Sequence, residues 1–340
     1  MTVAPRAVLR AVLGIGISIL AFVLVFQSID PAEVRNVIAA ASPAWVGLMS
    51  VFIGVDIVVR AVRWQRLLAP VRVVAFRRTL SYLLIGYLAN NVLPLRLGEL
   101  VRCHYAGDRE GLSRTTALGT VVVERIVDIG VVVAIAAVAI LVLSVRGIVA
   151  NAVLVGLAVT ALLVIVLAVG IAAHRLPGAE RVAAAAGRWP RIGQLATRLR
   201  EGLAVAGRPR TLLEALGLSI VAWGATLLAF AAAGQAVGVE LTIGQASLLA
   251  SGVALAAAIP SGPASLGTFE LAGMRIAQGF GVSADAGFAM ALLVHAAILV
   301  ITSIGGVVAL VRLGWERDML TEIEPESEAA RGPATGGTID

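Results

Sequence analysis

Long apolar runs separated by short, arginine-bearing segments dominate the chain. A helix needs about 20 apolar residues to cross a bilayer, and runs of this length recur along the whole sequence. The pattern predicts an all-α polytopic membrane protein. We expect six spanning helices, at Ala7–Phe26, Ala44–Val62, Ala117–Leu143, Ile148–Ala172, Leu212–Val237 and Ala284–Val311.

Two other apolar stretches are short and end in residues that break helices. Thr79–Leu93 is followed by Pro94, and Thr242–Ile259 is followed by Pro260 and a second short apolar stretch. Proline lacks the backbone donor and clashes with the preceding turn, so helices usually end before it. We therefore expect two helical hairpins, over about residues 79–106 and 242–280.

The loop arginines determine the expected orientation of these elements. Segments 60–78 and 174–211 hold fourteen of the 27 basic residues, and positively charged loops stay in the cytoplasm. By the same rule both termini are cytoplasmic, and the acidic loop 27–42 lies outside. The hairpins then enter the membrane from opposite sides without crossing it. Two oppositely oriented re-entrant hairpins in an inverted-repeat-like arrangement are typical of transporters, and we expect a multi-pass protein of the cell (inner) membrane.

Composition supports this class. Of the 340 residues, 59% are hydrophobic and 14% are charged, against about a quarter charged in soluble domains. The net charge of +6 does not indicate a nucleic-acid partner, because the basic residues flank apolar runs. We expect one transmembrane domain over residues 1–314 and a disordered acidic tail over 315–340. The one cysteine, Cys103, excludes an internal disulfide, and we expect it to react with an impermeant maleimide from the cytoplasmic side.

Three charged residues, Glu124, Arg125 and Asp128, lie within the predicted span Ala117–Leu143. Each ionised group at the centre of a membrane helix costs roughly 2.5–3.5 kcal/mol unless it meets a partner or water. Glu124 and Asp128 are four residues apart and share a helix face, and Arg125 is placed to pair with Asp128. Two interpretations stay open. The cluster closes a polar cavity and holds an anionic group, or it is a buried ion-pair network that only joins helices.

Polar residues also surround the break of each hairpin. In the first hairpin, Arg96 and Arg102 offer several donors each, which suits a phosphate group, and Glu99 is three residues before Arg102 and can pair with it. The half-helix that follows adds the positive end of its dipole. In the second, Ser261 is a small donor beside prolines and glycines, and Glu270 adds an acid. The alternative is a pair of ordinary loops.

Other polar residues in the helices have simpler explanations. Asp56 and Arg60, four residues apart, are explained by a helix-stabilising pair. His295 is more simply a neutral, hydrogen-bonded histidine than a proton relay. The chain contains no metal-binding pattern, P-loop, nucleophile elbow or dinucleotide fingerprint, so we expect no cofactor.

Three motifs, in this order and spacing, resemble the hallmarks of one family. They are Asn90-Asn91-Val92-Leu93-Pro94-Leu95-Arg96-Leu97-Gly98-Glu99-Leu100-Val101-Arg102, then Glu124-Arg125 with Asp128, then Pro260 to Gly267 with Glu270. Over about residues 5–312 the chain resembles the flippase-like membrane domain of lysylphosphatidylglycerol synthases and their stand-alone relatives. The resemblance implies movement of a lipid between leaflets. In the fused proteins this lipid is aminoacylated phosphatidylglycerol, and stand-alone members are associated with dolichol-linked or hopanoid pathways.

We therefore predict a lipid transporter or flippase for an anionic or aminoacylated phospholipid, or for a polyprenyl-linked lipid. The sequence does not continue into the soluble aminoacyl-transferase domain of the fused proteins, so we expect no enzyme activity. Membrane lipids would be its partners. Two alternatives are a non-catalytic membrane partner of a lipid or glycan synthase, and a membrane enzyme with Glu124 or Asp128 as general base. The predicted substrate-binding residues are Asn90, Asn91, Pro94, Arg96, Gly98, Glu99, Arg102, Glu124, Arg125, Asp128, Pro260, Ser261, Gly267 and Glu270.

Overall fold

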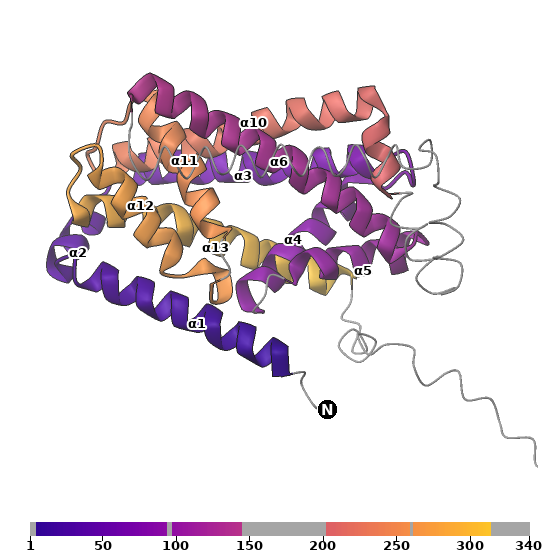
Figure 1. Cartoon of the computed structure of the whole chain (residues 1–340), viewed down its shortest axis with the longest axis horizontal. Helices are drawn as coiled ribbons and strands as arrows, with labels where there is room; N and C mark the ends of the chain where they lie inside the picture. Colours follow the sequence, from indigo (N-terminus) through magenta and orange to yellow (C-terminus); the bar gives the residue numbers. More distant parts are fainter. Residues whose placement is uncertain (1–4, 94–96, 145–201, 259–260, 314–340) are drawn as a thin grey trace, which may run out of the picture.

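The computed structural model describes residues 5–93, 97–144, 202–258 and 261–313, with side chains from residue 16 onward. Within these ranges every regular element is a helix (Figure 1). The α-helices are α1 (Pro5–Phe26), α2 (Pro31–Ala39), α3 (Pro43–Leu68), α4 (Phe76–Val92), α5 (Gly98–Glu110), α6 (Arg114–Leu143), α10 (Pro209–Ala236), α11 (Ile243–Ala257), α12 (Thr268–Gln278) and α13 (Ala284–Leu313), with 3₁₀ turns η3 (Ala204–Gly207) and η4 (Pro263–Ser265).

Four of these helices, α3, α6, α10 and α13, are long and apolar enough to cross a membrane. A bent pair, Gly16–Phe26 of α1 with α2, makes a fifth candidate if it counts as one span, although its two helices meet at 85°. The prediction of an all-helical, polytopic membrane protein is confirmed at this level. The predicted span Ile148–Ala172, the arginine-rich segment up to residue 201, and the tail 315–340 lie outside the described residues.

The predicted outside loop, residues 27–42, contains helix α2. The beginning of this helix is specified locally, because the Asp30 side chain accepts a hydrogen bond from the Ala32 N–H at 2.8 Å and Pro31 takes the first helical position. Asp285, at the beginning of α13, accepts a hydrogen bond from the Asp30 N–H at 2.7 Å. The turn after α1 is thereby fixed to the rest of the bundle.

Antiparallel packing of α3 against α6 and α10 forms the centre of the bundle. At one end of α3 the Ser42 N–H donates to the Ala236 carbonyl, at the end of α10. Near the other end, Trp64 donates to Thr120, close to the beginning of α6. Alanines make up much of the buried face of α10, and small residues let membrane helices approach closely.

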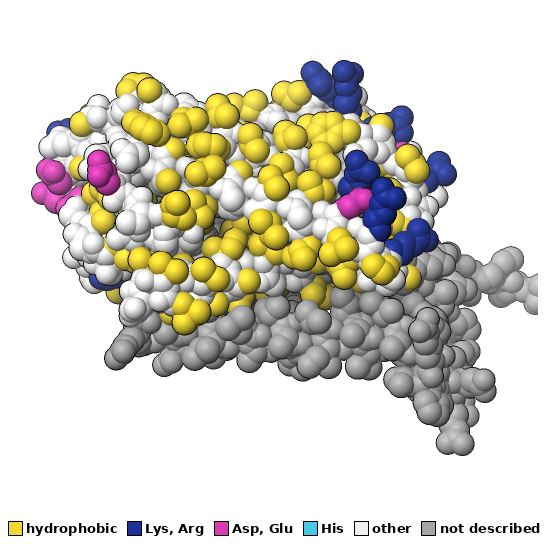
Figure 2. Space-filling view, turned by 90° about the horizontal axis from the view of Figure 1, so that it is seen from above, with side chains coloured by type: hydrophobic (Ala, Val, Ile, Leu, Met, Phe, Trp, Pro, Cys, Tyr) yellow, Lys and Arg dark blue, Asp and Glu magenta, His cyan; other side chains and the backbone are white. Residues whose placement is uncertain are grey.

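Charged side chains divide the molecule into two ends. The end at which α3, α5 and α13 finish is called the basic end, and its arginines are visible at the right of Figure 2. The opposite end has three exposed acids, Asp30, Glu33 and Glu240, against the exposed arginines Arg35 and Arg275, and the face between the two ends is largely apolar or uncharged. An apolar belt with one basic end is the surface expected of a membrane protein. The exposed arginines of the basic end are Arg66, Arg72, Arg77, Arg78, Arg109, Arg114, Arg208, Arg210 and Arg312.

Helices α4 and α5, the first helix pair, begin and finish at the basic end. They are antiparallel, because Tyr82 of α4 donates to Glu110 near the end of α5 at 2.6 Å, while Gly86 meets Gly98 at its beginning. A Cβ on Gly98 would collide with the Gly86 carbonyl oxygen, so the close approach requires glycine there.

Helices α11 and α12, the second helix pair, belong to the opposite end. α11 begins beside the end of α6, where Gly244 packs on Leu143, and α12 contacts α11 where Ile276 meets Gly252. A capping box between Thr242 and Gln245, three residues later, specifies the beginning of α11. In Figure 1 the two helix pairs accordingly lie towards opposite ends of the long axis.

The turns of the two helix pairs meet the middle of α13. Asn91, near the first turn, donates to Thr302 at 2.9 Å, and the Ala264 carbonyl oxygen, in the second turn, lies 3.0 Å from His295 Nε2. Thr302 and His295 are seven residues apart, about 10 Å along the helix axis. Helix α4 also contacts η4 directly. The predicted opposed hairpins correspond to these two helix pairs, and their re-entry into a membrane stays a prediction.

Candidate functional site

A cavity of about 240 Å³ lies where the two helix pairs meet α3, α10 and α13. Pockets for whole drug-sized ligands usually start near 300 Å³, so this space suits a headgroup rather than an entire lipid. The lining is mainly apolar, formed by Ile53, Ile57, Trp223, Phe230, Ala250, Val253, Ala254, Phe269 and Ile298. The polar residues among the lining are Asp56, Arg60, Tyr87, Asn90, Asn91, Thr226 and Thr302.

The charged part of the cavity wall is the pair Asp56 and Arg60, one turn apart on α3. Arg60 Nε donates to the Asp56 carboxylate at 2.8 Å, and the Thr226 hydroxyl of α10 donates to Asp56 at 3.2 Å. The Arg60 guanidinium lies 5.0 Å from the centre of the Trp223 ring, a cation–π distance. The helix pairing predicted for Asp56 and Arg60 is present, and it also supplies the ionised groups of the cavity wall.

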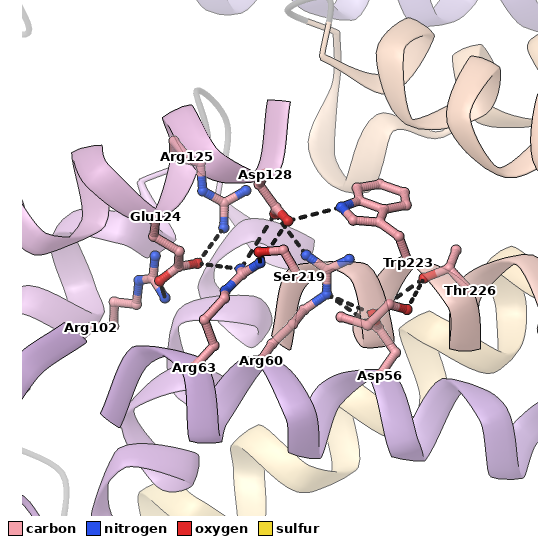
Figure 3. Close-up of polar contacts among 11 residues, drawn as sticks. Asp56, Arg60, Arg63, Arg102, Glu124, Arg125, Asp128, Ser219, Trp223 and Thr226 are labelled. Atoms are coloured by element: carbon pink, nitrogen blue, oxygen red, sulfur yellow. Dashed lines mark hydrogen bonds and ion pairs between the residues drawn. The ribbon is translucent and has the colours of Figure 1, made fainter. Parts of the chain in front are cut away.

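Behind this wall, a buried ion-pair network joins α3, α5, α6 and α10 (Figure 3). Asp128 of α6 is at its centre. Its Oδ2 accepts from Arg60 at 2.8 Å, and its Oδ1 accepts from Arg63 at 2.6 Å and from Trp223 Nε1 at 2.9 Å. Arg63 also donates to Ser219 of α10 at 2.7 Å. Both carboxylate oxygens of Asp128 are therefore engaged by protein donors.

Three guanidinium groups surround Glu124, one turn from Asp128 towards the basic end. Arg63 and Arg125 each donate to Glu124 Oε1 at 3.1 Å, and Arg102 Nη1 of α5 lies 3.2 Å from Oε2. Arg102 is 2% exposed and stacks over the Trp64 ring at 4.7 Å. Its three side-chain nitrogens have no hydrogen-bond partner among the described residues. Arg125 thus pairs with Glu124, whereas the spacing suggested Asp128, and the charge partner of Arg102 is Glu124, whereas the spacing suggested Glu99.

The charges of the network are evenly matched within the described residues. Arg60, Arg63, Arg102 and Arg125 carry four positive charges, Asp56, Glu124 and Asp128 carry three negative ones, and Glu99 of α5 adds a fourth that acts on Arg125. Buried charges without partners are expensive, and hydrogen bonds with good geometry offset that cost. Of the four arginines, Arg60 is the one that lines the cavity.

Two asparagines hold the turn of the first helix pair. Asn90 Oδ1 accepts from the Gly98 N–H at 2.7 Å and so satisfies one of the free donors at the beginning of α5. Asn91 Nδ2 donates to Thr302 and to Ser303 of α13, at 2.9 and 3.0 Å. Both asparagines line the cavity, so the side chains that contact the beginning of α5 and the middle of α13 also face this space.

Glu270 holds the turn of the second helix pair. Its Oε2 accepts from the Gly267 N–H at 2.8 Å, and its Oε1 lies 2.6 Å from His295 Nδ1. Gly267 has a φ of +84°, in the region that favours glycine. The Ser261 hydroxyl accepts from Thr268 at 3.2 Å. The Glu270 and His295 side chains are buried, and their separation of 25 residues explains why the sequence alone did not connect them.

The structure separates the predicted site residues by location. Some line the cavity, some form the network behind it, and others shape the turns. Their roles in binding stay predictions. The cavity includes Asn90 and Asn91; the network includes Arg102, Glu124, Arg125 and Asp128; the turns include Gly98, Ser261, Gly267 and Glu270; Glu99 is half-buried in the first turn of α5; and Pro94, Arg96 and Pro260 lie outside the described residues.

Several residues of the site were not predicted as such. Arg63 was assigned to a cytoplasmic loop, but α3 continues to Leu68 and holds Arg63 fully buried. Its charge inside an extended apolar helix is a signal that could have been used. Trp223 and Thr226 carry no such signal, because they contribute only through their partners on α3 and α6. Within the described residues, no group of three His, Cys, Asp or Glu side chains is arranged to hold a metal ion.

Cys103 is inaccessible in the folded protein. It is 2% exposed and packs in a core cluster with Trp64, Tyr82 and Tyr105. Its position on α5 faces the bundle, so the expectation that it labels from the cytoplasmic side is wrong for the native state.

Comparison with known proteins identifies the family. Residues 11–306 match the family model described as the lysylphosphatidylglycerol synthase TM region. The chain belongs to this family. The resemblance found in the motifs is thereby confirmed.

The chain is also similar to a protein named glycosyltransferase AglD, of Haloferax volcanii, with 31% identity over 166 residues. This match covers 47% of the chain and 24% of AglD, so the chain corresponds to about a quarter of that relative's length. No solved structure matches the chain.

Proposed function

We propose that this member of the lysylphosphatidylglycerol synthase TM region family is a non-enzymatic transporter that moves a phosphate-bearing lipid between membrane leaflets. The observation that carries the proposal is the cavity between α4 of the first helix pair and α11 and α12 of the second. Asp56 and Arg60 line it together with aromatic and aliphatic side chains. A lipid headgroup with attached chains needs both kinds of surface.

The proposed orientation follows from the charge of the two ends. Arginine-rich surfaces stay in the cytoplasm, so the basic end is assigned to the cytoplasmic side of the cell membrane and both chain termini with it. The two helix pairs then enter the membrane from opposite sides. Irregular backbone at mid-membrane depth is tolerated where it is buried or lines a cavity, and in the described part of the second turn Ser265 is buried next to Ala264, which contacts His295 of α13.

The arginine that lines the cavity supports a phosphate as the recognised group. Arginine binds phosphate through several parallel donors. Arg60 lines the cavity, and in the network beside it the three side-chain nitrogens of Arg102 have no hydrogen-bond partner among the described residues. An anionic phospholipid or a polyprenyl phosphate would bring its phosphate to Arg60, and its acyl or prenyl chains would rest against the apolar side chains of the lining.

Reconstitution tests this proposal. Purified protein is placed in vesicles that contain a fluorescent phospholipid or polyprenyl phosphate, and an impermeant quencher reports exchange between leaflets. We expect exchange above that of protein-free vesicles, and we expect Ala254→Phe, which fills the cavity, to abolish it. Ala296→Phe is the matched control, because Ala296 is exposed on α13. Absence of exchange by the wild type, or equal exchange by both variants, would refute the proposal.

The similarity to AglD favours one second candidate, a membrane partner of a glycan-synthesising enzyme. That protein's name assigns it glycosyl transfer, and the match lies within a quarter of its length. This function requires a stoichiometric enzyme partner in native membranes. Purification of a tagged chain with such a partner, together with no lipid exchange by the chain alone, would favour it over transport.

A further inference from the structure

Glu270 of α12 and His295 of α13 form a buried pair that the transport proposal does not use. Glu270 is 1% exposed and His295 is 4% exposed. The Phe269 ring stacks on His295 at 4.2 Å between ring centres and also lines the cavity. The histidine is therefore separated from the cavity by a single aromatic side chain.

Both ring nitrogens of His295 face oxygen acceptors. Nδ1 lies 2.6 Å from Glu270 Oε1, and Nε2 lies 3.0 Å from the Ala264 carbonyl oxygen. A backbone carbonyl can only accept, so Nε2 must carry a proton. A second proton must then lie between Nδ1 and Oε1, because otherwise two lone pairs face each other at hydrogen-bond distance. The geometry thus defines a pair that holds one proton more than a neutral histidine beside an ionised glutamate.

We propose that Glu270 and His295 form a proton-binding site that locks the turn of the second helix pair. With the shared proton bound, Nε2–H holds the Ala264 carbonyl. When that proton leaves, the one remaining ring proton is attracted to the Glu270 carboxylate. Nε2 then presents a lone pair to the Ala264 carbonyl oxygen, and the contact that holds the turn is lost.

The turn is suited to such a release. Ala264 and Ser265 have φ values of +55° and +58°, although neither is glycine. This left-handed region is unfavourable for residues with a Cβ, so the conformation persists only while surrounding contacts impose it. The hydrogen bond from His295 to Ala264 is one such contact, and it acts directly on the strained backbone.

Among the described residues, few other charged groups are near enough to set the charge of the pair. Gly267 supplies only a backbone N–H to Glu270. On α3, Asp56 and Arg60 line the cavity, and Tyr87 of α4 lines it too. On α12, Arg275 bonds to Gln278 and Ser28. On α13, Asp285 bonds to the Asp30 N–H and Arg312 lies in the last turn, and helix α11 has no charged residue.

The site gives the transporter a chemical link to a proton gradient. The turn belongs to the end proposed to face outside, so an acidic exterior keeps it locked and loss of the proton frees it beside the cavity. The proton site itself is defined by Glu270, His295 and Ala264. Its use as an energy source rests on the proposed transport function.

The accessibility of a cysteine placed in the turn reports whether the contact between His295 and Ala264 is made. In a Cys103→Ser background, Ser261→Cys places a thiol at the turn, and Ser283→Cys places an exposed reference thiol near the same end. The labelling rate of the first relative to the second is followed from about pH 5 to about pH 9, the range that contains ordinary histidine titration. We expect the ratio to rise about tenfold with pH, the effect of losing one hydrogen bond to a charged donor.

Two variants are designed to keep the contact with the Ala264 carbonyl oxygen at every pH, because neither depends on the shared proton. In Glu270→Gln the amide oxygen accepts from the Gly267 N–H and the amide nitrogen donates to Nδ1. In His295→Gln an amide N–H reaches towards the Ala264 carbonyl. Both are expected to give a low ratio at every pH, whereas Asp285→Asn, a control on α13, keeps the wild-type titration.

A flat wild-type ratio, or variants that titrate like the wild type, would overturn the proton site. The wild-type measurement decides the question even if one variant fails to fold. Lipid exchange with and without an imposed pH gradient is measured in parallel. If the labelling ratio changes with pH but no lipid is exchanged, transport is refuted and the proton site stands. If lipid is exchanged but the labelling ratio does not change with pH, the proton site is refuted and transport stands.

Discussion

Neutralising Asp128 tests the ion-pair network most directly. Asp128→Asn keeps the shape of the side chain but removes the charge that Arg60 and Arg63 face at 2.8 and 2.6 Å. Two guanidinium groups at about 4 Å between charge centres each lose roughly 4 kcal/mol of attraction at an effective dielectric constant of 20. Arg60 keeps Asp56 and Arg63 keeps Glu124, so only part of this loss appears as net destabilisation.

Removing one partner of a buried ion pair typically lowers the free energy of unfolding by about 3–5 kcal/mol. For a chain of this size such a loss corresponds to a fall on the order of 10 °C in Tm. The lone thiol supplies the assay, because Cys103 is buried in the native state and becomes reactive only on unfolding. Heating in detergent with a thiol-reactive fluorophore then reports the melting curve.

The matched control is Glu214→Gln, since the ion pair between Glu214 and Arg210 lies at the surface. Exposed pairs contribute little, so this variant should melt with the wild type. Equal melting temperatures for Asp128→Asn and Glu214→Gln would refute the electrostatic reasoning. Lipid exchange by Asp128→Asn below its melting temperature then separates the two interpretations of the cluster. A wild-type rate means that the network only joins helices, and loss of exchange from a folded protein means that Asp128 also serves the ligand.

Two further predictions follow from packing. Gly98→Ala places a methyl group against the Gly86 carbonyl oxygen and is expected to lower stability by about 1–3 kcal/mol. Gly217→Ala, on an open face of α10, should be neutral or stabilising. Equal melting temperatures of the two variants would contradict the close approach of α4 and α5. Cys103 should stay unlabelled by maleimide from either side of intact vesicles and label fully after denaturation, while Ser283→Cys labels in the native state; native labelling of Cys103 would contradict the burial of α5.

The helices and the two interrupted pairs were predictable because their signals are local. Apolar length located α3, α6, α10 and α13, and prolines and glycines located the breaks of the helix pairs. Helix α2 also had a local signal, Asp30 followed by Pro31, but the short segment around it was interpreted from its charge alone. Its bend of 85° relative to α1 depends on contacts with α13 and could not be obtained from residues 27–42.

The sequence predicted which types of residue form the site, but not which residues form ion pairs with one another. Glu124 and Asp128 stand out because a charged side chain in an apolar helix needs a partner. The sequence indicates that a partner is required but does not identify it. Arg63 and Trp223 fill that role from helices that are distant in sequence. The pairing depends on the register between α3, α6 and α10, which small buried residues along α10 set through close packing.

The position of Arg60 explains how one structure can serve both stability and binding. Its Nη1 donates to Asp128 inside the network, while its Nε donates to Asp56 on the cavity wall. A ligand phosphate that approached Arg60 would compete with Asp56, whose other partner is the Thr226 hydroxyl. Asp128 would keep the guanidinium in place during that exchange. Under the proposed function the buried network would be a fixed support, and the exchangeable contact would be the one with Asp56, the carboxylate that lines the cavity.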